Sequence, residues 1–446
     1  MPSAKKIGLL SGATIMIANM VGVGVYTSLG YQLLGISSTL AVVLLWAVGG
    51  LVALCGALTY AELAVVFPRS GGEYNFLSRI YHPAVGFLSG WVSITVGFAA
   101  PMAASAMAFG EYFQNIAENG NQKLLAAGVI VAITAINLLS FSVGKKFQAS
   151  VTIMNIALIL CFIIFGFLFS DSSHFHLTAT STDFGACFSQ SFAVSLIYVS
   201  FAYSGWNSIT YIVEDVEAPQ KNLPRILFLG TFIVLLLYVG LNFIFLYSTP
   251  KEQFLISLPD GGMGAQVKIA LIAAKNIFHQ NGIPFIVLIL SIGFIASVNS
   301  MMIIGPRVSK VVGNDIRLLG FLSKDVYKDV PVISTLLQAG IALLMILTSS
   351  FDEIITYIGF TLSIFTSLTV LGVFIIRIKK LNIPGQYKTL GFPVTPVIFI
   401  GLELWMVFNV ITDRQKLIPS LVTFGIILLG LIIYFANSYF YKNSEK

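Results

Sequence analysis

The sequence predicts an all-α integral membrane protein with twelve transmembrane helices. Of its 446 residues, 57% are hydrophobic and only 10% are charged, whereas about 25% of residues are charged in ordinary soluble domains. Apolar runs long enough to cross a hydrocarbon core of roughly 30 Å as helices recur along the whole chain. This composition excludes an ordinary water-soluble enzyme and makes the lipid bilayer the main environment of the chain.

Each predicted helix is an apolar run that ends in polar, Gly or Pro residues. No long polar appendage separates the runs, so we expect one membrane domain over 1–446. It would consist of one repeat over about 7–170, a second over about 187–377 and two peripheral helices over about 392–441. The predicted spans are 7–33, 39–66, 83–112, 123–141, 147–170, 187–213, 225–249, 283–305, 331–350, 354–377, 392–412 and 417–441.

The basic residues predict the orientation of these spans. An even number of spans places both termini on one side of the membrane. If Lys5 and Lys6 are cytoplasmic, nineteen of the 25 Lys and Arg residues lie inside, which agrees with the enrichment of basic residues in cytoplasmic loops. We therefore expect a multi-pass protein of the cytoplasmic membrane with both termini inside. The net charge of +6 then reflects topology, and no nucleic-acid partner is expected.

The first and sixth spans contain interruptions near their middle. Two glycines stand in Val21-Gly22-Val23-Gly24-Val25, and Tyr203-Ser204-Gly205-Trp206-Asn207 interrupts the sixth apolar run. Glycines in membrane helices often serve only close packing. However, spans one and six occupy equivalent positions if the first ten spans form two inverted repeats. In transporters that are built from inverted repeats, paired interruptions of this kind mark the substrate site.

An interrupted helix offers backbone groups that suit a zwitterion. A half-helix that begins near Gly24 would present free N–H groups and the positive end of its dipole, which favour a carboxylate. The half-helices before the breaks end with free carbonyls, which suit an ammonium group. An α-amino acid could therefore be held without any charged side chain.

A set of short motifs runs along nearly the whole chain. The motifs are Gly22-Val23-Gly24-Val25-Tyr26, Tyr60-Ala61-Glu62-Leu63, Pro68-Arg69-Ser70-Gly71-Gly72-Glu73-Tyr74, Phe201-Ala202-Tyr203-Ser204-Gly205-Trp206-Asn207, Glu214-Asp215-Val216, Pro219 to Arg225, Ser297-Val298-Asn299 with Arg307, and Tyr387-Lys388 with Gly391 to Pro396. In this order they resemble the amino acid, polyamine and organocation transporter superfamily, most closely its L-type amino acid transporter branch.

The resemblance implies a LeuT-type fold of 5+5 inverted repeats, with helices 1 and 6 broken and two peripheral helices. It also implies that backbone N–H groups near the first break bind a substrate carboxylate, that carbonyls at both breaks bind the amine, and that Phe201 covers the substrate from outside. The implied substrate-binding residues are Met20, Gly22, Val23, Gly24, Phe201, Ala202, Ser204 and Asn207.

Three departures from the family pattern affect the expected specificity and coupling. Val23 stands where the family has serine, which removes a hydroxyl group but leaves the backbone N–H groups for the carboxylate. Ser204 stands where the family has glycine, and its hydroxymethyl group narrows the side-chain pocket, which favours small to medium neutral amino acids. Asn155 takes the place of a lysine through which many relatives couple transport to an ion. Exchange, ion coupling and facilitated transport all remain open, and Asn155, Glu62 and Arg69 are candidates for coupling or gating.

For the other acidic and histidine residues, a structural interpretation is weighed against a functional one. Glu62 and Glu73 are either solvated at the inner face or pair with arginines there, such as Arg69, Arg79 or Arg307. Glu403 lies deep in a peripheral span, where a structural contact is the preferred interpretation. The pair His174 and His176 lacks further ligands for a metal, so no metal or other cofactor is expected.

The predicted function is secondary amino acid transport by a permease or exchanger. An enzyme would need a positioned nucleophile, base or metal, and no predicted span contains histidine. A transporter of polyamines or other organic cations on the same fold is the alternative, although neither break contains an acidic residue. The expected partners are the amino acid substrate and the lipid bilayer. The L-type branch that the chain resembles often pairs with a heavy subunit through a cysteine in the loop between spans three and four. Residues 113–122 contain no cysteine, so no disulfide-linked heavy subunit is expected.

Overall fold

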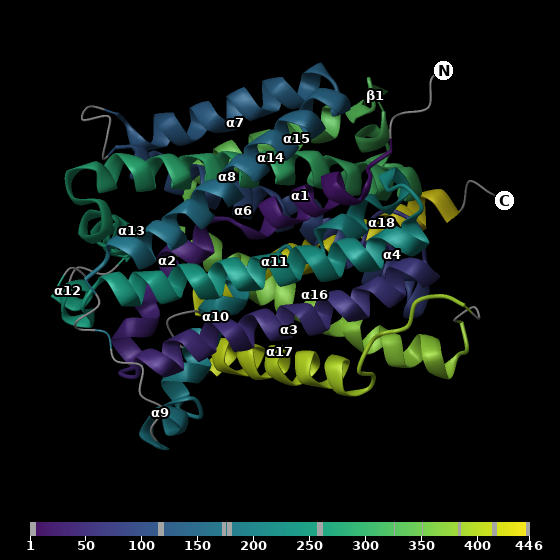
Figure 1. Cartoon of the computed structure of the whole chain (residues 1–446). Coiled ribbons are helices and arrows are strands. Elements are labelled where there is room, and N and C mark those ends of the chain that lie inside the picture. Colours follow the sequence, from purple (N-terminus) through teal and green to yellow (C-terminus); the bar gives the residue numbers. More distant parts are fainter. Residues whose placement is uncertain are drawn as a thin grey trace.

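The computed structural model consists almost entirely of helices that run side by side (Figure 1). It describes residues 6–114, 120–171, 175, 181–256, 262–324, 326–349, 351–381, 385–412 and 417–442. Within these ranges, seven helical segments are long and apolar enough to cross a membrane, and four shorter apolar helices accompany them. The prediction of an all-α membrane protein is confirmed, whereas the twelve-span order with 5+5 repeats stays a prediction.

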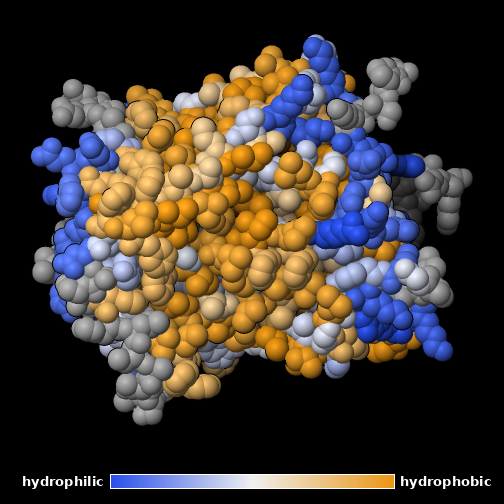
Figure 2. All heavy atoms as spheres, viewed as in Figure 1, coloured by the Kyte–Doolittle hydropathy of each residue, from blue (hydrophilic) through white to orange (hydrophobic). Residues whose placement is uncertain are grey.

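The surface has the pattern expected of a protein in a bilayer. Hydrophobic residues cover the middle of the face shown in Figure 2, and hydrophilic residues gather at its two ends. Large apolar side chains such as Leu168 and Phe408 are two-thirds exposed, which would be unfavourable in water but is expected against lipid tails. The first helix begins and the last helix ends at the same end of the bundle (Figure 1).

The first half of the chain follows the predicted spans closely. Pro83 begins one helix at the position where a missing N–H costs nothing, and Ser38 and Ser140 cap two others through their hydroxyl oxygens. The elements are α1 (Leu9–Met20), α2 (Val23–Gly35), α3 (Thr39–Val66), α4 (Glu73–Ile80), α5 (Pro83–Val92), the π-helix η1 (Ser93–Gly97), α6 (Ala99–Phe113), α7 (Gln122–Leu139) and α8 (Phe141–Phe169).

The second half contains more elements than predicted. Its only described strands, β1 and β2, pair antiparallel, with Tyr327 opposite Val330. The elements are α9 (Ser181–Ala186), α10 (Gln190–Tyr203), the 3₁₀-helix η2 (Ser208–Asp215), α11 (Pro219–Ser248), α12 (Lys251–Ile256), α13 (Gly262–Phe278), η3 (His279–Asn281), α14 (Gly282–Asp315), η4 (Arg317–Ser323), β1 (Val326–Tyr327), β2 (Val330–Pro331), α15 (Val332–Thr348), α16 (Phe351–Ile378), α17 (Val394–Thr412) and α18 (Leu417–Lys442).

One boundary differs substantially from the prediction. The eighth span was expected to end at residue 305, but α14 continues to Asp315 through Pro306. Proline removes one backbone hydrogen bond and normally kinks a helix. Here side chains donate to carbonyls just before the proline: Arg307 Nη1 to Ile303 O (2.9 Å) and Gln338 Nε2 to Met301 O (3.1 Å).

The core surrounds the two interrupted helices. α1 packs against α8, α11 and α14, while α2 packs against α10 and α13. α3 lies along α11, and α6 lies along α14. The breaks after α1 and α10 are therefore enclosed by protein, as an unwound backbone in a membrane requires.

Candidate functional site

The first break separates α1 from α2 at Val21 and Gly22. Val21 leaves the helical region with ψ of 84°, and Gly22 is extended (φ −127°, ψ −154°). Gly22 N donates to Met20 O at 2.8 Å, which closes a tight turn. The first N–H groups of a helix lack intrahelical partners, and α2 begins at Val23, one residue before the predicted start near Gly24.

The second break follows α10 and contacts the last turn of α1. Ser204 ends the helix with ψ of 154°, and Gly205 has a positive φ of 94°. A Cβ atom on Gly205 would lie 2.5 Å from Asn19 Oδ1 and 2.7 Å from Asn19 O. Gly205 therefore tolerates no side chain, for two reasons. Its positive φ favours glycine, and Asn19 occupies the space that a Cβ atom would need.

The helices beside the breaks also meet closely. A Cβ atom on Gly24 would lie 2.5 Å from Ala202 Cα and 2.8 Å from Ala202 Cβ. Tyr238 of α11 shares its hydroxyl between Met20 O at 2.6 Å and Ala202 O at 3.1 Å. The Met20 carbonyl, predicted to bind an amine, thus already accepts hydrogen bonds from Gly22 N and Tyr238, and an ammonium group would compete with them.

A cavity of about 50 Å³ opens beside the breaks. A water molecule needs roughly 10–15 Å³ by this measure, so the cavity can hold several waters. Of the predicted binding residues, Ser204 and Asn207 line it, while the other six lie outside its wall. Its lining residues are Asn19, Glu73, Ser89, Val92, Ser93, Gly97, Phe98, Pro101, Ser204, Gly205, Asn207, Ser208, Tyr211, Met301 and Phe365.

Sequence reasoning missed the wall formed by the π-helix η1. Ser93 and Gly97 belong to this wide turn between α5 and α6, and both line the cavity. Single-turn π-helices inside α-helices are frequent at functional sites. The apolar run over 83–112 contains no proline or charge within η1, so hydrophobic periodicity gives no signal for it.

The remaining predicted binding residues lie close to the breaks. Phe201 is half-buried in the last turn of α10, and Val23 is buried at the start of α2. Asn155 is buried on α8, where its amide faces α14: a Cβ atom on Gly293 would lie 3.0 Å from Asn155 Nδ2. Its Oδ1 finds no hydrogen-bond donor among the described residues.

Glu73 is the acidic residue of the cavity wall. It lies in α4, between the membrane-spanning helices α3 and α5, and is 3% exposed. Its Oε1 accepts hydrogen bonds of 2.8 Å from Tyr60 Oη and from Asn207 Nδ2. Burial raises the pKa of Glu73 to about 7, although these hydrogen bonds and contacts with Tyr211 and Ser89 act in the opposite direction.

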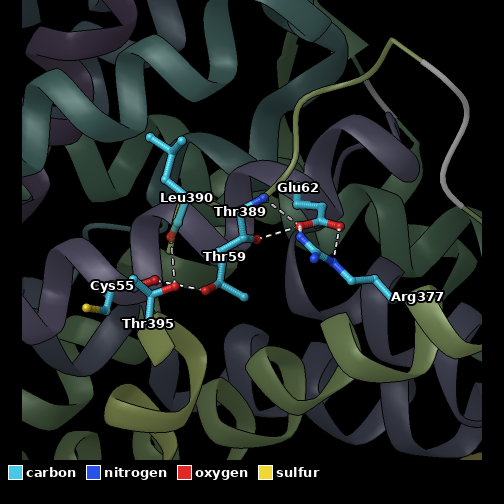
Figure 3. Close-up of polar contacts among 7 residues, drawn as sticks. All are labelled: Cys55, Thr59, Glu62, Arg377, Thr389, Leu390 and Thr395. Carbon is cyan, nitrogen blue, oxygen red and sulfur yellow. Dashed lines mark hydrogen bonds and ion pairs between the residues drawn. The ribbon is translucent and has the colours of Figure 1, made fainter. Parts of the chain in front are cut away.

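Glu62 forms a buried cluster at the end of α3 (Figure 3). Its carboxylate accepts two hydrogen bonds from Arg377, Nε at 3.0 Å and Nη2 at 2.7 Å. Thr389 donates to it through N at 2.7 Å and Oγ1 at 2.6 Å, and Arg377 lies over the ring of Phe392. The cluster joins α3, α16 and the segment before α17.

The pairing expected between the inner carboxylates and Arg69, Arg79 or Arg307 is therefore wrong for Glu62. Arg69 instead pairs with Asp315 at 2.7 Å, and Arg307 pairs with Asp215 at 2.8 Å. These partners lie far apart in the sequence, so hydrophobic patterns could not identify them.

The other singled-out polar residues do not build a site. Glu403 is 8% exposed on α17, and Ser363 of α16 hydrogen-bonds its carboxyl group. His174 and His176 lie outside the described residues. Within the described part of the chain, no cluster of three potential metal ligands occurs.

Two broken helices in contact, inside an apolar helical bundle, are the geometry that the transporter motifs imply. A family model described as amino acid permease matches residues 7–436. The chain belongs to the amino acid permease family. This permease is 28% identical to the serine/threonine exchanger SteT of Bacillus subtilis (strain 168), over 97% of this chain and 96% of that protein.

The permease also resembles two mammalian transporters. It is 26% identical to the b(0,+)-type amino acid transporter 1 of Mus musculus, over 98% of this chain and 88% of that protein. It is 27% identical to the large neutral amino acids transporter small subunit 2 of Oryctolagus cuniculus, over 98% of this chain and 81% of that protein. These matches confirm the family predicted from the motifs and its assignment as a transporter rather than an enzyme.

Proposed function

We propose that this permease moves small to medium neutral amino acids across the cytoplasmic membrane by alternating access, with the substrate held between the two breaks. The observation that carries the proposal is the direct contact of Asn19, in the last turn of α1, with Gly205 of the second break, beside a cavity whose wall includes Ser204 and Asn207. The start of α2 would bind the carboxylate. Carbonyls at the ends of α1 and α10 would bind the amine.

The size of the cavity supports a carrier mechanism. At about 50 Å³, it accommodates a few waters but must widen before an amino acid can enter. A site that changes size with its ligand is typical of a carrier that opens to one side at a time. Opening would separate α2 from α10, which now meet at Gly24 and Ala202, so substrate binding and conformational change would be linked.

Three observations support the preference for neutral side chains and exchange. Ser204 places a hydroxymethyl group on the cavity wall in place of the family glycine. Asn155 offers no charge on α8 to replace a coupling ion. The exchanger SteT, named for serine and threonine, aligns over almost the full length. We therefore propose exchange of small neutral amino acids, with both termini cytoplasmic and no disulfide-linked heavy subunit.

One observation favours the alternative of an organic cation as substrate. Sequence reasoning placed no acidic group at the breaks, yet Glu73 lines the same cavity. A carboxylate there could attract a second ammonium group of a polyamine. Neutral amino acids remain the preferred substrates, because Glu73 already accepts short hydrogen bonds from Tyr60 and Asn207.

The proposal is tested by radiolabelled uptake into proteoliposomes. The panel comprises serine, threonine, alanine, leucine, lysine and putrescine, each with and without internal amino acid, and with imposed proton or sodium gradients. We expect uptake of serine, threonine or alanine that requires internal amino acid. Uptake of putrescine alone would establish the organic-cation alternative, and uptake driven only by a gradient would replace exchange by coupled import.

A further inference from the structure

Glu73 is a buried carboxyl group whose hydrogen-bond partners are neutral. The basic residues of the same inner loop interact elsewhere: Arg69 pairs with Asp315, and Arg79 Nε donates to Asn75 Oδ1 at 3.1 Å. Among the described residues, no ion pair to Glu73 is found. A buried charge without a counter-charge is costly, so such a group tends to bind a proton instead.

The groups that face Glu73 come from several elements. α3 contributes the Tyr60 hydroxyl, η2 contributes Tyr211, and α5 contributes Ser89. η1, α14 and α16 contribute Ser93, Met301 and Phe365 to the same cavity, and the second break contributes Asn207. The only titratable groups in this set are the two tyrosines, which ordinarily titrate near 10, so Glu73 is the group that can change charge near neutral pH.

The two carboxylate oxygens differ in their surroundings. Oε1 accepts two hydrogen bonds of 2.8 Å, from Tyr60 Oη and Asn207 Nδ2. Oε2 accepts a longer one of 3.5 Å from Ser89 Oγ. A proton on Oε2 would disturb the weaker contact, and it would reduce the negative charge that holds the Asn207 amide.

We propose that Glu73 is a proton-binding site of the cavity and that its proton controls, through Asn207, the mobility of η2, the segment that follows the break after α10. This inference rests on the proposed transport function. Asn207 is the residue from which η2 begins. The charged carboxylate holds the start of η2 against α3 and α4. The protonated group holds it less strongly, and the segment after the break then moves more easily.

The direction of the pH effect follows. A carboxyl group that titrates near pH 7 is about nine-tenths protonated one pH unit below that value and about one-tenth protonated one unit above it. Exchange by the wild-type protein should therefore become several-fold faster as pH falls through this range. Glu73→Gln resembles the neutral form, and it should exchange at the fast rate at every pH.

The first test measures exchange of a radiolabelled neutral amino acid in proteoliposomes, with equal pH on both sides and no gradient. Wild type is compared with Glu73→Gln and with the control Glu403→Gln, which removes a buried carboxyl group outside the cavity. We expect the pH dependence to disappear only in Glu73→Gln. A Glu73→Gln variant that keeps the wild-type pH profile overturns the proposal, as does a control that loses it.

A second measurement tests proton binding even if the Glu73→Gln variant does not transport. Infrared difference spectra of the substrate-free protein, recorded as pH is lowered through 7, should contain the C=O band of a newly protonated carboxyl group. That band should lose intensity in Glu73→Gln. In Glu403→Gln, which removes only the contribution of the other buried carboxyl group, the part that depends on Glu73 should remain. A band that persists unchanged in Glu73→Gln refutes proton binding. Because no substrate is present, failure of the proposed transport function would leave this result intact and separately visible.

Discussion

Substitution of Gly24 by alanine should disrupt the contact between the two half-helices. The new methyl carbon would lie 2.5 Å from Ala202 Cα, whereas carbon atoms in favourable contact are about 3.5–4.0 Å apart. α2 and α10 must therefore separate by roughly 1 Å. Overpacking of this kind costs about 1–3 kcal/mol, and it acts where the proposed site requires the halves to meet.

The assay combines thermal unfolding with exchange in proteoliposomes. Gly24→Ala should insert into the membrane, unfold at a lower temperature and lose at least about tenfold in exchange rate, because an error of about 1 Å in positioning can cost roughly a hundredfold in rate at a site that depends on geometry. Gly128→Ala on α7 is the matched control, since nothing lies within 4 Å of its added methyl group. The control should behave as wild type.

Normal exchange by Gly24→Ala, with an unchanged unfolding temperature, would refute the reasoning. It would mean that the contact between α2 and α10 relaxes without cost and that the first break does not hold the substrate. Loss of exchange in Gly128→Ala as well would show that the assay reports general damage to the bundle. Leucine at Gly24 adds volume, and we expect it to abolish exchange.

Three further substitutions test separate features of the structure. Tyr238→Phe removes the hydroxyl between the carbonyls at the two breaks. It should lower the free energy of unfolding by about 1–3 kcal/mol, as measured by thermal unfolding. It should also slow exchange. Glu62→Gln leaves Arg377 without its charge partner. Because this arginine is a quarter exposed, we expect the free energy of unfolding to fall by an amount near the lower end of roughly 3–5 kcal/mol. Wild-type stability would contradict a structural role for Glu62. Glu403→Gln keeps the hydrogen bond to Ser363, so exchange and its pH dependence should be unchanged, and loss of that dependence would indicate a coupling role.

The membrane class and the positions of both breaks were predictable from sequence. Hydrophobicity reports burial in lipid directly, and glycine at 205 reports a local backbone requirement, because its φ is positive. The expected position of the second break, 203–207, agrees with the end of α10 and the turn that follows it. Local signals of this kind depend only on neighbouring residues.

The missed features depend on the tertiary fold. Glu62 and Arg377 are separated by 315 positions, so nothing in either neighbourhood indicates their contact. Glu73 appeared to be an inner-face residue because its sequence surroundings are polar, yet α4 packs against α5 and α16, and Glu73 is buried there. Helices α12 and α13 lie between the predicted spans 225–249 and 283–305, where no helix was predicted.

The wide turn at Ser93–Gly97 imposes a constraint on chain length. Ser89, Ser93, Gly97 and Pro101 lie four residues apart and all line the cavity. In a regular α-helix, positions four apart drift by about 40° per step, so the last would lie about 120° away from the first. The π-turn takes up part of this drift with one additional residue. Deleting one residue here would replace the π-turn by a regular α-helical turn. The direction of α6 could be kept, but the four positions would no longer share one face of the helix.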